Sequence, residues 1–352
     1  VFYDYNPLIA RNEVGDSPSV AGISVAEFHQ KMILRQDTWP HSLNAGTTHD
    51  TKRGEDSRIR LCWLSSIPEE WIAVVIKWRE MNKALAGEGK GKPAPLPNDE
   101  YFIYQSLLGG FPADLAVTDE FRTRFHDMLT KALREAKMAT NWDKPDEDYE
   151  RKCHAFVDAL LSGESSFMSD FLPFARRCMQ ESMRYSLSQL LLKLTAPGIP
   201  DIYQGAECED LSFVDPDNRR PVDYDLRRAL LRQVKEGNSE GAEKMHTIYK
   251  TLAYRNTCQK VFSMGEYIPI ELTGAHLAFI RHYEKDWALI VVPLIRMTSA
   301  PQENLSVKLP EGAPAVWVNI FTGDMVQGSG GRLEQDGLLK KFPVAMLTGR
   351  NE

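Results

Sequence analysis

The sequence lacks a hydrophobic run long enough to cross a membrane. Its longest apolar stretch, Trp287–Ile295, has nine residues and is interrupted by Pro293, whereas a transmembrane helix needs about 20. We interpret this stretch as a strand and expect no membrane partner. The chain shows no signal peptide, and it begins with Val1 in place of Met. We therefore expect a cytoplasmic protein whose N-terminus is a cut within a longer chain.

An excess of positive charge is also absent. Forty-two Lys and Arg residues face 49 Asp and Glu residues, so the formal net charge is −7. A chain of this charge is a poor non-specific ligand for nucleic acid, and we expect no nucleic-acid partner. With 352 residues, 43% of them hydrophobic, the chain can bury a large core and is expected to form two or more folded domains.

Cysteine is too rare and too irregular for a disulfide framework or a zinc finger. The five cysteines form an odd set without a Cys-x-x-Cys pair, so they cannot all be paired. We expect reduced thiols, as in the cytoplasm, and no metal or cofactor. The five positions are Cys62, Cys153, Cys178, Cys208 and Cys258.

Helical spacing of apolar residues dominates the chain up to about residue 256. Ser24 and Glu27 form a capping box at the first predicted helix. The Gly- and Pro-rich stretch Gly87–Pro97 is expected to be a surface loop, after which Asn98 or Asp99 caps the next helix. The predicted helical stretches are Ile23–Gln36, Ile59–Leu194 with separate helices at Phe121–Met138, Asp146–Leu161 and Phe167–Leu194, then Asp225–Glu236 and Ser239–Asn256.

The apolar period changes to two after Met264, which indicates strands. Earlier in the chain, Val1–Tyr5 and Ile199–Gln204 are predicted as short strands, and Leu43–Thr48 as a buried strand that leads into a polar loop. Regular spacing of the late strands favours an antiparallel sandwich. The late strands are Tyr267–Leu272, Leu277–Tyr283, Trp287–Ile295, Leu305–Leu309, Ala315–Phe321 and Val344–Leu347.

A dense polar cluster, Thr48–Asp56, follows the predicted strand Leu43–Thr48. His49 and Asp50 can grip neighbouring hydroxyls, since one donates and the other accepts hydrogen bonds, and Lys52 and Arg53 add charged donors. Polar side chains at the end of a barrel strand face the active site. Two alternatives stay open at this point. The cluster could be a solvated turn with Asp50 or Asp56 capping a helix, or a metal site completed by His29 or His41.

A second polar cluster comprises Pro200–Glu207 and Asp215–Tyr224. Its start resembles a calcium loop, but Arg219 and Arg220 occupy a ligand position and the required glycine position, so the calcium pattern fails. The loop is either a structural knot of ion pairs or the polar wall of a sugar or phosphate site. Trp142, between two predicted helices, either stacks on a sugar ring or fills the joint between the helices.

Taken together, these segments resemble the C-terminal half of the maltooligosyltrehalose synthase family, which belongs to the alpha-amylase superfamily. The similarity covers nearly the whole chain in the expected order, and the strongest match is the longest one, Pro197–Tyr224. The matching segments are Gly46–Leu61, Pro68–Trp71, Asn98–Tyr104, Lys131–Lys137, Asn141–Trp142, Ser186–Leu194 and Pro197–Tyr224.

The resemblance implies an α/β plus all-β fold. It predicts the C-terminal part of a (β/α)8 barrel with a large helical insertion, followed by an antiparallel β-sandwich. Leu43–Thr47 would be the seventh barrel strand and Ile199–Tyr203 the eighth. Four segments follow: 1–56 as a partial barrel with the His-Asp motif, 57–166 as the insertion, 167–258 as the last barrel segment with the loop Pro197–Tyr224, and 259–352 as the sandwich.

The resemblance also implies an activity and a site. Enzymes of this family convert the reducing-end α-1,4 link of a maltooligosaccharide into an α,α-1,1 link by retaining intramolecular transglycosylation. Asp50 matches the third carboxylate of the superfamily, His49 its hydroxyl-binding neighbour, and Lys52 is expected to hold the terminal glucose. The expected partner is a maltooligosaccharide or α-1,4-glucan. Further substrate-binding candidates are Arg53, Trp142, Tyr203, Gln204, Glu207, Asp217, Asn218, Arg219 and Arg220.

The chain departs from the family pattern in one respect. The nucleophilic Asp and the acid Glu precede the His-Asp motif in this superfamily, and no Gly-x-Arg-x-Asp motif occurs here. We therefore expect the chain to be inactive alone and to need the missing N-terminal half as a partner. Two alternatives are a non-catalytic glycan-binding or assembly fragment, and an α-glucan hydrolase or glucanotransferase of the same superfamily.

Overall fold

The computed structural model describes residues 2–18, 22–89, 91–163, 165–272, 274–295, 305–335 and 338–351. Its backbone contacts divide the chain into two compact units. The first unit comprises Val1–Ala21, Thr47–Ser182 and Asp210–Pro221, and the second comprises Gly22–Gly46, Met183–Glu209 and Val222–Glu352. Each unit is therefore assembled from segments that are far apart in the sequence. The division into four segments expected from the sequence stays a prediction.

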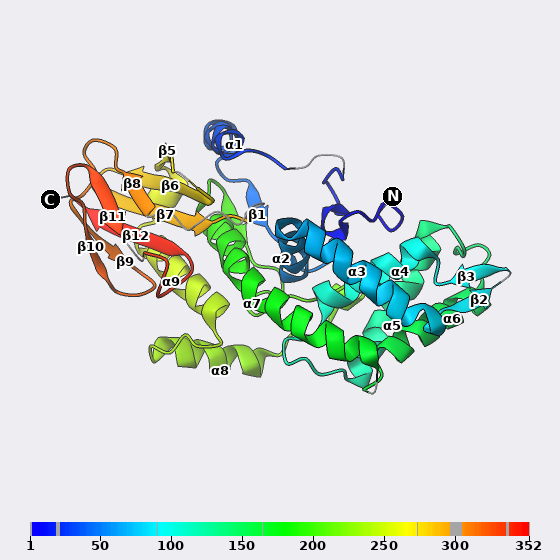
Figure 1. The fold of residues 1–352 in the computed structure, drawn as a ribbon. Coiled ribbons are helices and arrows are strands. Elements are labelled where there is room, and N and C mark those ends of the chain that lie inside the picture. Colours follow the sequence, from blue (N-terminus) through cyan, green and yellow to red (C-terminus); the bar gives the residue numbers. More distant parts are fainter. Residues whose placement is uncertain are drawn as a thin grey trace. The chain divides into compact units, whose positions relative to one another are not determined.

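The first unit is mostly helical (Figure 1). Short 3₁₀ turns lie at Ile9–Arg11, Leu64–Ser66, Lys83–Leu85 and Asp217–Arg219. Its helices and strands are α2 (Glu55–Trp63), α3 (Pro68–Asn82), β2 (Gly87–Gly89), β3 (Lys92–Ala94), α4 (Pro97–Gly110), α5 (Asp119–Ala136), α6 (Glu147–Leu160) and the first part of α7 (Ser166–Thr195).

Aromatic side chains form much of the core of this unit. Trp78 of α3 is fully buried, and its ring lies 5.1 Å from that of Phe167 on α7 and 5.5 Å from that of Tyr104 on α4. The end of α4 needs a glycine, because the ring of Phe213 packs closely against its backbone there. A Cβ on Gly110 would lie 2.3 Å from Cε1 of Phe213, so only glycine lets the segment Asp210–Pro221 pack there.

The helices α5 and α6 confirm the predicted helices, and α5 also shows the predicted helical spacing of apolar residues. On α5, Phe125, Leu129 and Leu133 recur at four-residue steps and are all buried. Thr118 caps α5 and Asp146 caps α6, each accepting a hydrogen bond from a backbone N–H in the first turn. The caps satisfy donors that a helix N-terminus leaves without an intrahelical partner.

The second unit combines helices with a six-stranded antiparallel sheet of order β10-β9-β12-β7-β6-β5. A separate antiparallel pair joins β11 to β8, and β1 pairs in parallel with β4. The elements are α1 (Val25–Thr38), β1 (Leu43–Ala45), the rest of α7, β4 (Ile199–Asp201), α8 (Tyr224–Lys235), α9 (Glu243–Thr257), α10 (Gln259–Ser263), β5 (Glu266–Ile270), β6 (His276–Tyr283), β7 (Asp286–Pro293), β8 (Leu305–Lys308), β9 (Val316–Asn319), β10 (Met325–Gln327), β11 (Arg332–Gln335) and β12 (Ala345–Arg350).

The central strand β7 shows why this sheet is buried on both faces. Ala288, Ile290 and Val292 join a core cluster with residues of α1, α7, α9 and α10. The alternate residues Trp287 and Leu289 join a second cluster with residues of β8 and β11 on the other face. Successive side chains of a strand point to opposite faces, so a nearly continuous apolar run fits a strand covered on both sides.

Several local predictions were wrong. Residues 2–4 form a turn where a strand was expected, and Val1 lies outside the described residues. The expected loop Gly87–Pro97 contains the short antiparallel pair β2–β3. Leu96, rather than Asn98 or Asp99, takes the cap position of α4. The Asp99 carboxylate instead accepts a hydrogen bond from Tyr149, and burial raises its pKa.

The strand predictions were partly right. All six predicted late strands overlap observed ones, but β10 and β11 were missed. They span only three and four residues, which is too short for an alternating pattern to stand out. The strand at Leu43 exists, but it is not buried, because Leu43 is 71% exposed.

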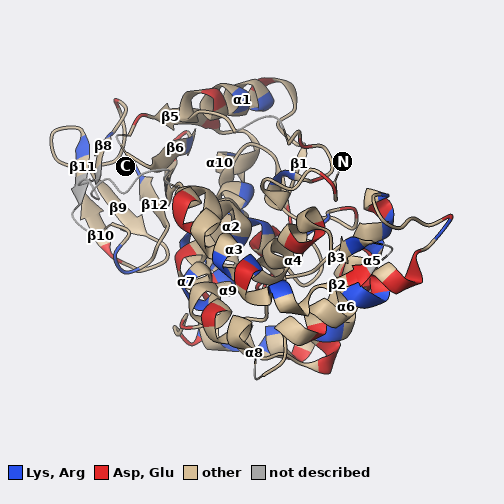
Figure 2. Cartoon of the chain, turned by 45° about the vertical axis from the view of Figure 1, so that its right-hand side comes forward, with Lys and Arg blue, Asp and Glu red and all other residues tan. Residues whose placement is uncertain are grey.

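Acidic and basic residues are interspersed along α5, α6 and α8 (Figure 2). None of the helices in the described part of the chain has the length and apolar character needed to cross a bilayer.

Candidate functional site

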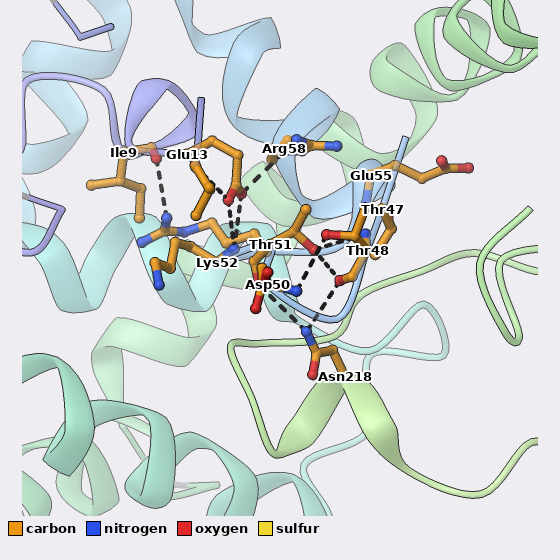
Figure 3. A network of polar contacts seen from close by, with 12 residues as sticks. Ile9, Glu13, Thr47, Thr48, Asp50, Thr51, Lys52, Glu55, Arg58 and Asn218 are labelled. Atoms are coloured by element: carbon orange, nitrogen blue, oxygen red, sulfur yellow. Dashed lines mark hydrogen bonds and ion pairs between the residues drawn. The ribbon is translucent and has the colours of Figure 1, made fainter. Parts of the chain in front are cut away.

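The His-Asp motif lies on a tight turn of the first unit, Thr48–Thr51, that is closed by its own side chains (Figure 3). Thr51 Oγ1 donates a hydrogen bond to the Thr48 carbonyl at 2.8 Å, and the backbone N–H of Asp50 donates to Thr48 Oγ1 at 3.2 Å. Threonine hydroxyls commonly stabilise turns in this way. The two threonines therefore fix the backbone on both sides of His49 and Asp50.

Glu13 anchors the end of this turn. Its two carboxylate oxygens accept hydrogen bonds from the backbone N–H of Lys52 at 2.8 and 2.9 Å. Glu13 is 6% exposed, and the guanidinium of Arg58 lies 3.9 Å from one of its oxygens. A buried carboxylate needs such partners, so the contact ties the turn to the N-terminal segment.

Asp210 anchors Thr47, just before the turn, and the start of α2, which follows the turn. Asp210 Oδ2 accepts a hydrogen bond from Thr47 Oγ1 at 2.8 Å, and the Asp210 carbonyl accepts one from the N–H of Ser57 at 3.3 Å. The cap residue of α2 is Gly54, which has no side chain to offer, so Asp210 takes over the capping from a distant segment. A Cβ on Gly54 would lie 2.3 Å from the Asp210 carbonyl oxygen, so glycine is required there.

His49 and Asp50 themselves project into solvent. Their side chains are 58% and 65% exposed, and His49 Nε2 lies 3.3 Å from Asp50 Oδ2. An imidazole N–H next to a carboxylate presents a donor and an acceptor side by side, the pattern that neighbouring sugar hydroxyls require. The pair is accessible to a ligand while its backbone is held on both sides.

Lys52 and Arg53 point in different directions from this pair. The Lys52 ammonium lies 5.2 Å from the centre of the Phe2 ring, and the residue is half-buried. Arg53 is 5% exposed and donates to the Ile9 carbonyl at 3.1 Å. Burial lowers the pKa of the Arg53 guanidinium to about 10, so it stays charged at neutral pH. Its placement favours support of the turn over direct contact with a ligand.

The segment Asp215–Arg220 forms a set of ion pairs. Arg124 of α5 binds the Asp217 carboxylate through Nε at 2.6 Å and Nη2 at 2.9 Å. Asp217 also lies 3.0 Å from Arg220 Nε, and Arg219 pairs with Asp215. Both arginines of the segment are exposed, whereas the Asp217 side chain is 9% exposed. The network of ion pairs that the sequence offered as one interpretation of this segment is therefore present.

Asn218 lies between these ion pairs and the His-Asp turn. Its Nδ2 donates to the His49 carbonyl at 2.9 Å and to the Thr48 carbonyl at 3.3 Å. The residue is 5% exposed. The structure thus brings Asn218 to the backbone of the turn that carries His49 and Asp50, whereas a contact between Asn218 and substrate stays a prediction.

Trp142 lies on the loop between α5 and α6 and is 53% exposed. The guanidinium of Arg134 covers its ring at 4.9 Å, and Glu150 holds that guanidinium through two hydrogen bonds of 2.7 and 2.8 Å. An aromatic ring of this exposure remains available for stacking on a sugar face.

The remaining candidates belong to the second unit. Gln204 is exposed, Tyr203 is half-buried, and Glu207 accepts a hydrogen bond from Arg227 Nε at 3.4 Å. His29 of this unit is buried, and its Nδ1 lies 2.8 Å from the Tyr267 hydroxyl oxygen. Within the described ranges, no three His, Cys, Asp or Glu side chains gather as metal ligands, so the metal alternative has no ligand set there.

Sequence reasoning missed two residues that shape the site, Glu13 and Asp210. Glu13 is 39 positions from Lys52, and no local pattern marks it. Asp210 is 163 positions from Thr47, although it falls inside the matching segment Pro197–Tyr224. Only that match could have drawn attention to Asp210.

The chain matches known proteins along its whole length, although no family model matches it. A protein of Mycobacterium tuberculosis (strain CDC 1551 / Oshkosh), named for maltooligosyl trehalose synthase, is 32% identical over 354 residues, covering 100% of this chain and 43% of that protein. The solved structure of maltooligosyltrehalose synthase from Arthrobacter ramosus is 28% identical with a TM-score of 0.84, and 99% of this chain covers 44% of it. The crystal structure of a hypothetical maltooligosyl trehalose synthase from Sulfolobus tokodaii is 30% identical with a TM-score of 0.77, again over 99% of this chain and 44% of that one.

The chain spans less than half the length of these relatives. The similarity extends over both units, since nearly every residue of the chain is aligned in the solved structures. Over its whole length, the chain is therefore similar in sequence and in fold to the maltooligosyltrehalose synthases, of which it matches less than half.

Proposed function

We propose that this chain supplies part of the active site of an enzyme that isomerises the reducing-end α-1,4 link of maltooligosaccharides to an α,α-1,1 link. The observation that carries the proposal is the exposed His49–Asp50 pair on a turn pinned by Glu13 and Asp210. The reaction is a retaining intramolecular transglycosylation: a carboxylate attacks the anomeric carbon, and the released glucose then attacks the glycosyl-enzyme through its own anomeric hydroxyl. The name shared by the relatives supports this choice of reaction.

In this proposal Asp50 binds hydroxyls of the sugar that is distorted during the reaction. Its carboxylate accepts hydrogen bonds that strengthen as positive charge develops on the ring, which lowers the barrier. His49, whose Nε2 lies 3.3 Å from Asp50 Oδ2, donates to a neighbouring hydroxyl of the same sugar. Lys52 holds the terminal glucose while it turns. Asp50 is therefore the one catalytic residue that we assign to this chain.

Further contacts to the glucan belong to the same proposal. Trp142 is the stacking candidate, because its ring is exposed and supported from behind by Arg134. Arg219 and Arg220 are exposed next to Asn218 and can donate to sugar hydroxyls. Tyr203, Gln204 and Glu207 stay predicted substrate contacts of the second unit. We assign no metal or cofactor to the reaction.

The assignment of two strands to a (β/α)8 barrel is also a proposal, and it rests on the strand pairing within the second unit. Leu43 pairs with Ile199 and Ala45 with Asp201 in a parallel register, as neighbouring barrel strands would. We therefore assign Leu43–Ala45 and Ile199–Asp201 to the seventh and eighth strands of a (β/α)8 barrel, whose other strands a separate N-terminal part supplies. The pair β8–β11 shares an apolar cluster with the six-stranded sheet, which supports a β-sandwich.

The site lacks a nucleophile and a general acid in this proposal, so the chain alone is expected to be inactive. Its five free thiols fit a cytoplasmic enzyme. The test is to assay trehalose-ended product from maltooligosaccharides with this chain alone, and again after mixing it with the N-terminal half of a solved relative. Product is expected only from the mixture, and Asp50→Asn is expected to lower turnover roughly 100-fold or more.

Each other result of this assay contradicts the proposal in a distinct way. Product from the chain alone would show that it carries its own nucleophile. Free glucose or lengthened glucans as the main product would indicate a hydrolase or glucanotransferase. Near-normal turnover of Asp50→Asn would refute the role of that carboxylate. Glucan binding without turnover in any mixture would favour a non-catalytic binding fragment.

A further inference from the structure

We infer that Asn218 is a positioning residue that aims the His49–Asp50 pair, and that it makes no contact with the substrate. The inference deepens the proposed function and rests on it for its catalytic consequence. Its starting point is the direction of the Asn218 amide. Nδ2 lies 2.9 Å from the His49 carbonyl oxygen, 3.3 Å from that of Thr48 and 3.5 Å from that of Thr51.

Three carbonyl oxygens around one position require a donor, so the amide nitrogen must face the turn. The Asn218 Oδ1 atom is buried on the other side and has no hydrogen-bond partner among the described residues. A substrate hydroxyl cannot reach an atom without solvent exposure. The side chain therefore acts inward, on the backbone of the turn.

The hydrogen bonds from Asn218 set the orientation of the exposed side chains of His49 and Asp50. The carbonyls of Thr48 and His49 belong to the peptide groups that precede His49 and Asp50, so fixing them sets the direction in which both side chains leave the backbone. His49 and Asp50 are 58% and 65% exposed, so little packing holds them in place. Their orientation has to come from the peptide groups, and Asn218 holds both.

Asn218 is itself held through its neighbour in sequence, Asp217. The Asp217 carboxylate receives two hydrogen bonds from Arg124 on α5 and one from the backbone N–H of Phe213 at 2.7 Å. Lys131 of α5 donates to the Asp215 carbonyl at 2.7 Å. The helix α5 thus braces the segment that carries Asn218, and through it the catalytic turn. This gives one helix of the proposed insertion a role in ordering the site.

The other anchors of the turn act elsewhere. Glu13 binds the N–H of Lys52, after the pair, and Asp210 binds Thr47, before it. Neither contacts the carbonyls of Thr48 and His49. Loss of Asn218 is therefore expected to loosen the middle of the turn while both of its ends stay attached.

The test compares Asn218→Asp and Asn218→Ala with the unaltered chain. Asn218→Asp keeps the shape but replaces the donor with an acceptor that repels the carbonyls. Asn141→Asp is the matched control, because Asn141 Oδ1 accepts hydrogen bonds from the N–H groups of Asp143 and Lys144, a role that a carboxylate oxygen keeps. Amide hydrogen exchange measured by NMR at Asp50 and Thr51 is expected to accelerate about tenfold or more in both Asn218 variants, with α2 and the control unchanged.

A second measurement concerns catalysis in the mixture with an N-terminal half. Both Asn218 variants are expected to lower kcat about tenfold or more while KM changes less than about twofold, because a misdirected Asp50 affects the transition state most. A direct substrate contact would instead change KM strongly with little change in exchange at the turn, and would overturn the inference.

The exchange readout separates this inference from the proposed function. Unprotected Asp50 and Thr51 amides in the unaltered chain, or equal exchange rates in all variants, would refute the positioning role whatever the activity. Accelerated exchange in the Asn218 variants, in a chain whose mixtures form no trehalose-ended product, would leave the positioning role standing and refute the proposed reaction.

Discussion

We expect the ion pair between Arg124 and Asp217 to be among the strongest single contacts between α5 and the segment Asp215–Arg220. Their side chains are 17% and 9% exposed, and two hydrogen bonds of 2.6 and 2.9 Å join them. Arg124→Leu removes both bonds, together with the stacking of the guanidinium over Phe213 at 5.5 Å. The same change leaves a largely buried carboxylate with fewer partners.

The expected loss in the free energy of unfolding depends on which partners the Asp217 carboxylate keeps in the variant. Breaking a buried ion pair by removing one partner costs about 3–5 kcal/mol when the other charge is left unpaired. Asp217 retains the N–H of Phe213 at 2.7 Å and Arg220 at 3.0 Å, although Arg220 is 43% exposed and screened by solvent. We therefore expect Arg124→Leu to lower the free energy of unfolding of the first unit by about 2–3 kcal/mol.

The assay is native-state hydrogen exchange of core amides in α4 and α5, which reports on the first unit separately from the second. A loss of about 2 kcal/mol corresponds to roughly 30-fold faster exchange. A double-mutant cycle with Asp217→Asn should give a coupling of about 1.5–2 kcal/mol. The matched control, within the same unit, is the cycle of Lys83→Leu with Glu80→Gln, an exposed pair at 77% and 78%, where about 0.5 kcal/mol or less is expected. Equal coupling in the two cycles would refute the reasoning.

Two further predictions concern stability. Gly110→Ala places a Cβ 2.3 Å from Cε1 of Phe213, whereas a Cβ on Gly163 meets nothing within 4 Å; thermal unfolding should show a loss of about 1–3 kcal/mol for Gly110→Ala and little for Gly163→Ala, and equal losses would contradict the packing argument. Burial, and then the nearby charge of His126, lower the pKa of His154. The unfolded chain therefore binds more protons than the folded one below about pH 6.5, and stability falls as the pH drops. His154→Gln should flatten the change in urea midpoint between about pH 7.5 and 5.5, and an unchanged slope would count against this assignment.

The fold could be predicted where local periodicity decides the structure. The amphipathic spacing of Phe125, Leu129 and Leu133 predicts α5, and the alternation around Leu289 fits a strand that is covered on both faces. Prediction failed where a contact from elsewhere competes with the local preference. Asp99 is a good cap residue, but its carboxylate accepts a hydrogen bond from Tyr149, 50 positions away, so α4 begins earlier.

The site could be predicted only in its exposed part. His49 and Asp50 stand out because polar residues cluster after a strand, and the structure leaves both side chains open to a ligand. Glu13 and Asp210 could not be found in this way, because each meets the turn only after distant segments have folded together. Arg53 carries the same local signal as Asp50, yet it is buried. A local polar pattern does not distinguish a side chain that faces a ligand from one that supports the backbone.

This division between exposed and supporting side chains is what the proposed carbohydrate site requires. Side chains that bind hydroxyls must be exposed, and exposure removes the packing that would otherwise hold them within the narrow range of positions that a transition state requires. Here the backbone of the turn compensates. The buried side chains of Glu13 and Asn218 and the half-buried side chain of Asp210 hold it after, between and before His49 and Asp50. Each of these anchors would leave buried polar groups unsatisfied if it let go, which costs about 1–3 kcal/mol per group, so the turn resists displacement even though its two outermost side chains are free to meet a ligand.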